Sequence, residues 1–251
     1  MFARLVIVCG CLGLFAMAGS AQDDQAELRK LVDRAIKAQG GAEVLGKFKA
    51  TKVKFKGKFY GMGEGIEYTG DMAYDLPDKF RFEIGMDIMG MKISIVQVSN
   101  GKKGWAKIIN DVKELDKEQQ AEVEQGLHVI RASHLIDLKG KDFKLSPLGE
   151  SKVEGKAVIG VRVSSKGRRD VNLFFGKDDA LLRKIETVVK DSMAGGQEFS
   201  QETIYDNYKQ VQGKFVPMKL AIRRDGKLFV DGETTSVEHA EKLDDAVFGR
   251  P

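Results

Sequence analysis

The stretch TKVKFKGKFY (51–60) decides the fold, because apolar and lysine side chains alternate along it with a period of two. Val53, Phe55 and Phe59 share one parity, whereas every even position from 52 to 58 is a lysine. Successive side chains of a β-strand point to opposite faces of its sheet. The pattern therefore predicts a strand with an apolar environment on one face and water on the other.

Comparable alternation recurs along the chain, with glycine-rich or Asn-Gly turn signals between the segments. We expect strands at 51–60, 65–75, 79–87, 90–99, 103–109, 141–149, 155–165, 169–177, 181–191, 197–208, 214–224 and 228–239. A sheet of about a dozen strands must curl, close or split. We predict a mainly β (α+β) protein, built as a single large antiparallel, incomplete (half-open) β-barrel. A closed lipocalin-like barrel is the alternative.

Two segments have helical rather than strand spacing. One runs over 24–38 and ends at two glycines, with a further helical turn expected at 42–45. The other covers 116–137 and carries Leu127 and Ile130 on one face. We expect the N-terminal and the central helix to lie over the concave face of the sheet. Leu127 and Ile130 then become candidates for the underside of a moving lid.

The first residues are typical of a secretory signal peptide. Arg4 precedes an apolar stretch, and small residues up to Ala21 form a cleavage region. We therefore predict a signal peptide at 1–21, cleaved near Ala21, and one exported, periplasmic domain over 22–251. Both cysteines lie inside the signal. The apolar run before Cys11 is too short to favour lipoprotein anchoring there.

Several functional classes are disfavoured by the composition. The net charge of +4 is well mixed, and no basic arm interleaved with aromatic residues predicts nucleic-acid binding. His128 and His134 are six apart on the expected helix, so they cannot share a metal ion. Catalytic signatures such as Gly-x-Ser-x-Gly or His-Glu-x-x-His are missing from the sequence. We expect no enzyme activity, no cofactor and no metal.

The order of the segments over nearly the whole mature chain resembles the outer-membrane lipoprotein-sorting proteins, the LolA/LolB-like superfamily. The segments that carry the resemblance are Gly40-Gly41, PDKFR (77–81), NGKKGW (100–105), DVNLFFGKDDALLRKIE (170–186) and Asp206–Tyr208 before GKFVP (213–217). The resemblance implies an unclosed antiparallel barrel, lidded by helices, that holds acyl chains and carries lipoproteins through the periplasm. It also implies that Arg81 holds the lid through hydrogen bonds, whereas the position of Arg81 on the polar side of its strand favours an ordinary surface ion pair.

The apolar strand positions are the candidate ligand-binding residues. They are Val53, Phe55, Phe59, Ile66, Tyr68, Met72, Phe80, Phe82, Ile84, Met86, Met89, Met91, Ile93, Ile95 and Trp105. Two interpretations stay open: these side chains fill a dry core, or they line a cavity. The methionines favour a cavity, because flexible thioether chains repack around variable apolar groups. Trp105 either stacks on cargo at the rim or anchors a hairpin in the core.

These observations predict a non-catalytic binding protein that holds acyl chains or lipidated proteins in an apolar cavity, with outer-membrane lipoprotein sorting as one such role. The expected partners are lipid acyl chains or lipoproteins, together with membrane-associated donor and acceptor proteins. We expect a monomer. The alternative is an envelope interaction or sensor protein of the same fold, whose groove binds a partner segment instead of free lipid.

Overall fold

The computed structural model describes residues 18–191 and 195–251, with the backbone alone for 18–24. Most of the expected signal peptide therefore lies outside the described residues. Helix α1 (Ala18–Ala38) begins before the expected start near Asp24 and includes the predicted cleavage region. Within the described ranges, no helix has the length and apolar character needed to cross a membrane.

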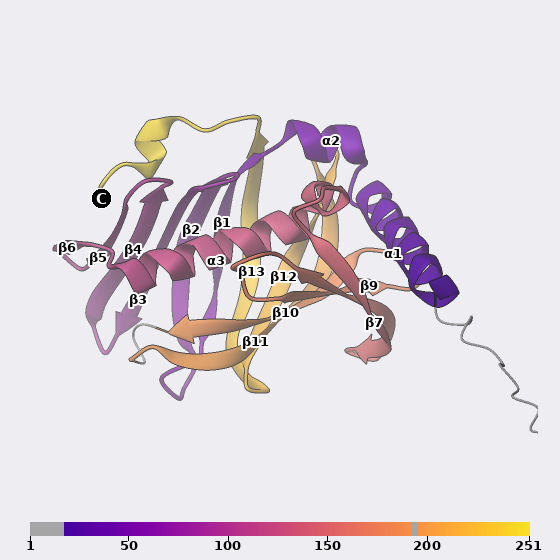
Figure 1. Cartoon of the computed structure of the whole chain (residues 1–251). Coiled ribbons are helices and arrows are strands. Elements are labelled where there is room, and N and C mark those ends of the chain that lie inside the picture. Colours follow the sequence, from indigo (N-terminus) through magenta and orange to yellow (C-terminus); the bar gives the residue numbers. More distant parts are fainter. Residues whose placement is uncertain (1–17, 192–194) are drawn as a thin grey trace, which may run out of the picture.

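Thirteen antiparallel strands form one sheet in the order β6-β5-β4-β3-β2-β1-β13-β12-β11-β10-β9-β8-β7 (Figure 1). The strands are β1 (Ala50–Phe59), β2 (Ile66–Asp75), β3 (Lys79–Ile88), β4 (Met91–Asn100), β5 (Gly104–Ile108), β6 (Asp111–Glu114), β7 (Lys144–Val153), β8 (Lys156–Ser164), β9 (Val171–Gly176), β10 (Leu182–Asp191), β11 (Gln197–Val211), β12 (Lys214–Arg224) and β13 (Lys227–Ala240). The edge strands β6 and β7 do not pair with each other. The incomplete barrel is confirmed, and the closed alternative is wrong.

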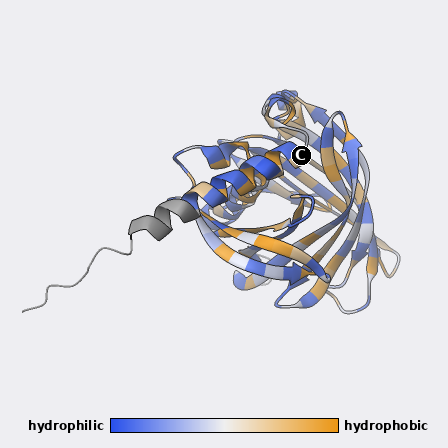
Figure 2. Cartoon of the chain, turned by 90° about the vertical axis from the view of Figure 1, so that its right-hand side faces the viewer, coloured by the Kyte–Doolittle hydropathy of each residue, from blue (hydrophilic) through white to orange (hydrophobic). Residues whose placement is uncertain are grey.

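The described helical segments are few and lie at the start, the middle and the end of the chain. They are α1, α2 (Ala42–Lys47), α3 (Lys117–His134) and the short 3-10 helices η1 (Ile136–Lys139) and η3 (Asp245–Phe248). Figure 1 shows α3 crossing in front of the sheet, and Figure 2 shows the strands curving around one side of the molecule. The helical spacing over 116–137 is thus confirmed, with its last turn formed by η1.

Two local expectations were wrong. The short edge strand β6 was missed, because four residues carry too little alternation to be recognised. The chain also does not turn at Gly149, which lies inside β7 at a register shift after Pro147. The turn comes at Glu154 and Gly155, whose φ values of 47° and 78° suit a tight two-residue hairpin.

The main core occupies only one half of the sheet. The helical stripe of α1, together with α2 and the end of α3, packs on β7–β10 around Leu173 and the fully buried Phe175. A smaller cluster joins Phe248 of η3 to Val98 and Ala73 on β1–β4. A third lies around Phe174 and Ile204. The apolar side chains of β1, such as Phe55, belong to none of these buried clusters of the described residues.

This asymmetry predicts different costs for two similar truncations. Phe175→Ala should destabilise the protein by about 3–5 kcal/mol, the usual cost of removing a buried aromatic ring. Phe82→Ala, on β3 with its ring half-buried, should cost roughly 1 kcal/mol, because part of its area is already in water. Urea unfolding of both variants measures the difference. Equal losses would show that the second face is packed as a dry core.

Candidate functional site: the apolar face and its helical lid

The strand register brings most of the predicted ligand-binding residues onto one face of β1–β4. Val53 lies opposite Met72, and Met72 lies opposite Phe82. We call the resulting set the apolar face: Val53, Phe55, Phe59, Ile66, Tyr68, Met72, Phe80, Phe82, Ile84, Met86, Ile93 and Ile95. Tyr68 is buried, and the other members are half-buried. Side chains so placed keep apolar area available for a ligand.

Glycines let two aromatic rings of the apolar face lie close to the backbone of neighbouring strands. A Cβ at Gly70 would lie 2.4 Å from the Phe55 ring, and one at Gly57 would lie 2.8 Å from the Tyr68 hydroxyl oxygen. Burial, with the nearby charge of Asp231, raises the pKa of Tyr68 to about 12. A residue larger than glycine at position 70 or 57 would therefore displace the Phe55 or the Tyr68 side chain.

Three predicted ligand-binding residues do not belong to the half-buried set. Trp105 is opposite Val98, whose own partner on β3 is Arg81, so strand alternation places it on the lysine-bearing face. Met89 occupies the β3–β4 turn with φ 54° and is 99% exposed. Met91 starts β4 at the exposed end of the apolar face. The placement of Trp105 among the apolar side chains is corrected, because its parity along β5 is the opposite one.

The lysine-bearing face has hollows of its own. One of about 810 Å³ is lined by Lys56, Lys58, Glu67 and Asp87 among others, so charges of both signs surround it. Another, of about 390 Å³, lies where β1 and β2 approach Val247. Charged side chains line both hollows, and each hollow is also lined by members of the apolar face: Tyr68, Met86 and Ile93 in the first, and Val53 and Met72 in the second. The apolar face itself is a partly exposed surface of an open barrel.

Helix α3 is the segment that spans the open barrel. In sequence it connects the two edge strands, β6 and β7. Near its start, the Gln120 amide donates a hydrogen bond of 3.2 Å to the Ser99 hydroxyl on β4. Directly below, a Cβ at Gly104 would lie 2.4 Å from Gln120 Oε1. At its end, His134 Nε2 donates to the Phe48 carbonyl oxygen at 3.0 Å. Both ends of the helix are therefore attached to the sheet side of the structure.

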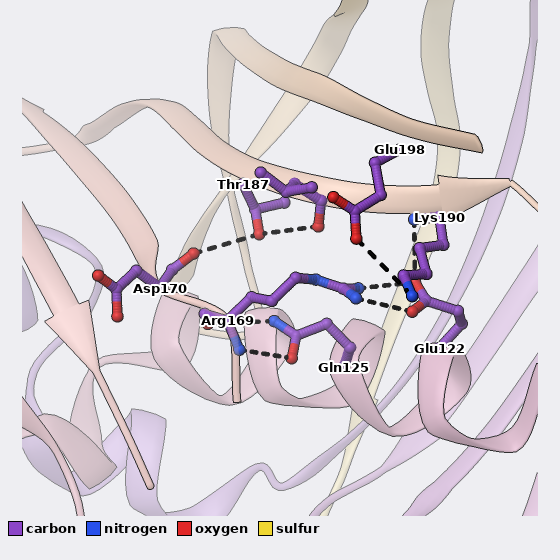
Figure 3. Close-up of polar contacts among 8 residues, drawn as sticks. Glu122, Gln125, Arg169, Asp170, Thr187, Lys190 and Glu198 are labelled. Carbon is purple, nitrogen blue, oxygen red and sulfur yellow. Dashed lines mark hydrogen bonds and ion pairs between the residues drawn. The ribbon is translucent and has the colours of Figure 1, made fainter. Parts of the chain in front are cut away.

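A group of polar contacts, the Arg169 clamp, holds the first half of α3 (Figure 3). Arg169 Nη1 and Nη2 donate to the two carboxylate oxygens of Glu122 at 2.8 and 2.6 Å. The Gln125 side chain pairs with both the backbone N–H and the carbonyl of Arg169. Burial alone would raise the pKa of Glu122, but the bonds from Arg169 and from the Lys190 backbone outweigh it and lower that pKa. Charge-assisted bidentate bonds of this kind fix geometry strongly.

The lid residues predicted from the sequence have different positions. Leu127 is buried on α3, and Ile130 is half-buried. Arg81 does not hold the lid; its guanidinium donates to Glu83 at 2.7 Å on the lysine-bearing face. Alternation along β3 places it on the side of the sheet away from α3. Arg169, which does hold the lid, lies 47 residues from Glu122 along the chain, and no local pattern marks the pair.

A cluster of buried basic side chains lies at the end of the apolar face nearest α2. Lys214 is 7% exposed, and burial lowers its pKa to about 8. Burial also lowers the pKa of both His134 and His239 to about 4, and the positive charge of Lys214 adds to both shifts. His239 Nδ1 lies 3.0 Å from the Thr51 hydroxyl. We call Lys214, His134 and His239 the basic cluster. In sequence, Lys214 has the pattern of an exposed strand-end residue.

No family model and no curated protein matches this chain. Solved structures do match it over 88% of its length, at 11% identity. One is an outer membrane lipoprotein-sorting protein domain from Vibrio parahaemolyticus, with a TM-score of 0.53 and 95% of that chain covered. Others are a LolA superfamily protein from Nitrosomonas europaea (0.55, 96%) and a DUF1329 family protein from Desulfovibrio piger (0.53, 96%). The chain has a LolA-like fold.

We predict that the Arg169 clamp controls the motion of the lid. Arg169→Gln removes the bidentate ion pair, so the amides of 117–134 should exchange with deuterium roughly tenfold faster. Hydrogen exchange measured by mass spectrometry tests this. Arg81→Gln is the matched control, because it removes an arginine–glutamate pair on the other face. The same acceleration in both variants would count against the clamp.

We also predict that Lys214 lowers the stability of the ligand-free protein. Below pH 8 its side chain is charged in both folded and unfolded states, and the folded state bears the cost of burying that charge. Lys214→Met should therefore raise the free energy of unfolding by about 3 kcal/mol at pH 7. This magnitude follows from the lowering of the Lys214 pKa from 10.5 to about 8. The gain should shrink as pH rises from 8 to 10.5, because folded Lys214 loses its proton first. Chemical denaturation across this range measures it, and a pH-independent effect would contradict the explanation.

Proposed function

We propose that this protein is an exported, periplasmic, non-catalytic binding protein that holds the acyl chain of a lipid or lipidated protein against the apolar face, beneath α3. The observation that carries the proposal is the contrast between the two halves of the sheet. Helices bury the side chains of β7–β10 in a core. The apolar face of β1–β4 keeps a set of large, half-exposed side chains, with no buried cluster of the described residues over it.

The energetics of acyl-chain binding suit reversible capture. Each buried methylene contributes about 0.8 kcal/mol, so one long acyl chain gains on the order of 10 kcal/mol before any cost is subtracted. Immobilising the chain and moving the lid offset part of this gain. The polar nature of the Arg169 clamp suits such motion, because its groups can bond to water when the helix lifts.

Exposed apolar side chains also gather at one end of the sheet. Six of the eight large exposed apolar residues in the described ranges lie in or beside hairpins at the end opposite α2; they are Met62, Met89, Met91, Ile108, Ile109 and Leu228. The β1–β2 and β12–β13 hairpins of this end are at the lower edge of Figure 1. These side chains extend the exposed apolar surface beyond the end of the apolar face at Phe59.

The solved structures of like fold support the proposal by analogy. One of them is described as an outer membrane lipoprotein-sorting protein domain. A lipoprotein cargo would place its acyl chains against the apolar face, and membrane-associated donor and acceptor proteins would then load and unload it. Lipoprotein sorting itself is one role within the wider proposal of acyl-chain binding by a monomer.

Phe82→Glu tests the proposal directly. A carboxylate in the middle of the apolar face should weaken binding of a fluorescent long-chain acyl probe at least about tenfold, because the charge must lose water against the tail. Thr69→Glu is the matched control: it adds the same charge on β2, exposed and on the lysine-bearing face. Fluorescence titration of delipidated protein gives both affinities.

Unchanged probe binding in Phe82→Glu would contradict the assignment of this face. If native mass spectrometry of protein purified from a bacterial envelope shows a co-purified polypeptide in place of lipid, the face binds a protein segment and the protein is an interaction module.

A further inference from the structure

The basic cluster lies on the same face of the sheet as the proposed acyl-chain site. Thr51 and His239 are direct neighbours across β1 and β13, and the next pair on that face is Val53 with Val237. From Thr51 the apolar face continues along β1 to Phe59. Eight residues of strand at about 3.3 Å each give a length of roughly 26 Å. One acyl chain spans half of a bilayer's hydrocarbon core, or about 15 Å, so chain and cluster fit on one surface.

The strands separate where Lys214 enters. Paired residues of β12 and β13 end at Lys219 and Glu233, five positions short of Lys214. Beyond that point the Gln212 side chain takes the place of backbone hydrogen bonds between β12 and β13. Its amide donates to the His239 carbonyl at 3.1 Å, and the His239 backbone N–H donates to Gln212 Oε1 at 2.6 Å. The separation gives a long side chain room between the strands.

Two groups of the basic cluster have unused capacity. Among the described residues, no carboxylate lies in an ion pair or hydrogen bond with Lys214, although it is 7% exposed. His239 is 4% exposed, and its Nε2 is buried with no hydrogen-bond partner. His134, by contrast, is committed to the Phe48 carbonyl. Asp137, the acid nearest His134, is paired with Arg131 at 2.8 Å.

Buried polar groups in proteins are almost always bonded, and a buried cation without an anion is costly. We propose that Lys214 and His239 form the binding site for the anionic oxygen head group of the acyl ligand, with a fatty-acid carboxylate as the simplest case. The inference rests on the proposed function and adds a head-group site to it. The tail would then extend along the apolar face towards Phe59.

His239 Nδ1 lies 3.0 Å from the Thr51 hydroxyl oxygen. In the tautomer in which Thr51 donates to Nδ1, the proton on Nε2 is free to be donated to a carboxylate oxygen. The Lys214 ammonium supplies the countercharge and up to three N–H donors. Lys49 adds positive charge near His134. Because no carboxylate of the described residues is paired with Lys214, an oxyanion is the group that completes the cluster.

The test compares three probes on the delipidated protein by isothermal titration calorimetry: palmitate, its methyl ester and acetate. We expect palmitate to bind at least tenfold more tightly than the ester, and acetate to bind negligibly. In Lys214→Met the preference for palmitate should disappear while ester affinity is kept. Lys219→Met, an exposed lysine of the same strand on the opposite face, should behave as the parent protein.

The outcomes separate the two proposals. Equal binding of palmitate and ester by the parent protein overturns the head-group site and leaves acyl-chain binding standing. A palmitate preference that survives in Lys214→Met also overturns the site. Tight binding of acetate alone shows a small-anion site unrelated to acyl chains. If neither palmitate nor ester binds, both proposals fail. The parent protein decides these cases even if Lys214→Met does not fold.

Discussion

The sheet of this protein does not close, and the positions of its helices follow from that gap. Strands β6 and β7 end the sheet without meeting, so the barrel needs a separate element across its opening. Helix α3 fills this role because it is the chain segment that connects those two strands. The first half of α3 is held by polar contacts, through Glu122 and Gln125 on one side and Gln120 on the other, whereas its end packs in the main core. A closed ladder of backbone hydrogen bonds would have been rigid, whereas side-chain bonds can be exchanged for water.

The division of the apolar residues follows from this arrangement. Helices α1 and α2 lie over β7–β10, where they exclude water and form a close-packed core around Phe175. In residues 18–191 and 195–251 no second pair of helices covers the apolar face of β1–β4, so residues such as Phe82 and Ile95 stay half-exposed. The protein is therefore stable through one half of its sheet and retains apolar area on the other. The buried charge of Lys214 lies beside the half of the sheet that the helices leave uncovered. Burying this charge costs free energy, which a bound anion would offset.

Local sequence patterns predicted the strands and most of the apolar face. They failed for residues whose role depends on the exact start of a strand or on a partner far away in the sequence. The period of two in 51–60 placed Val53, Phe55 and Phe59 together, as the register confirms. Trp105 was misplaced because the exact start of β5 sets its parity, and strand boundaries are the weakest part of such predictions. Arg169 was missed because an arginine in a loop has no periodicity that indicates its partner.

The amino-acid sequence by itself determined the alternation of the strands, the helical stripes and hence the mainly β, incomplete barrel, because these follow from the backbone geometry of neighbouring residues. Only the tertiary structure decided which apolar side chains are buried and which remain half-exposed, since that depends on where helices pack. It also decided the surroundings of Lys214 and His239. Their burial and unused bonding capacity arise where β12 and β13 separate, and no stretch of sequence encodes that separation on its own.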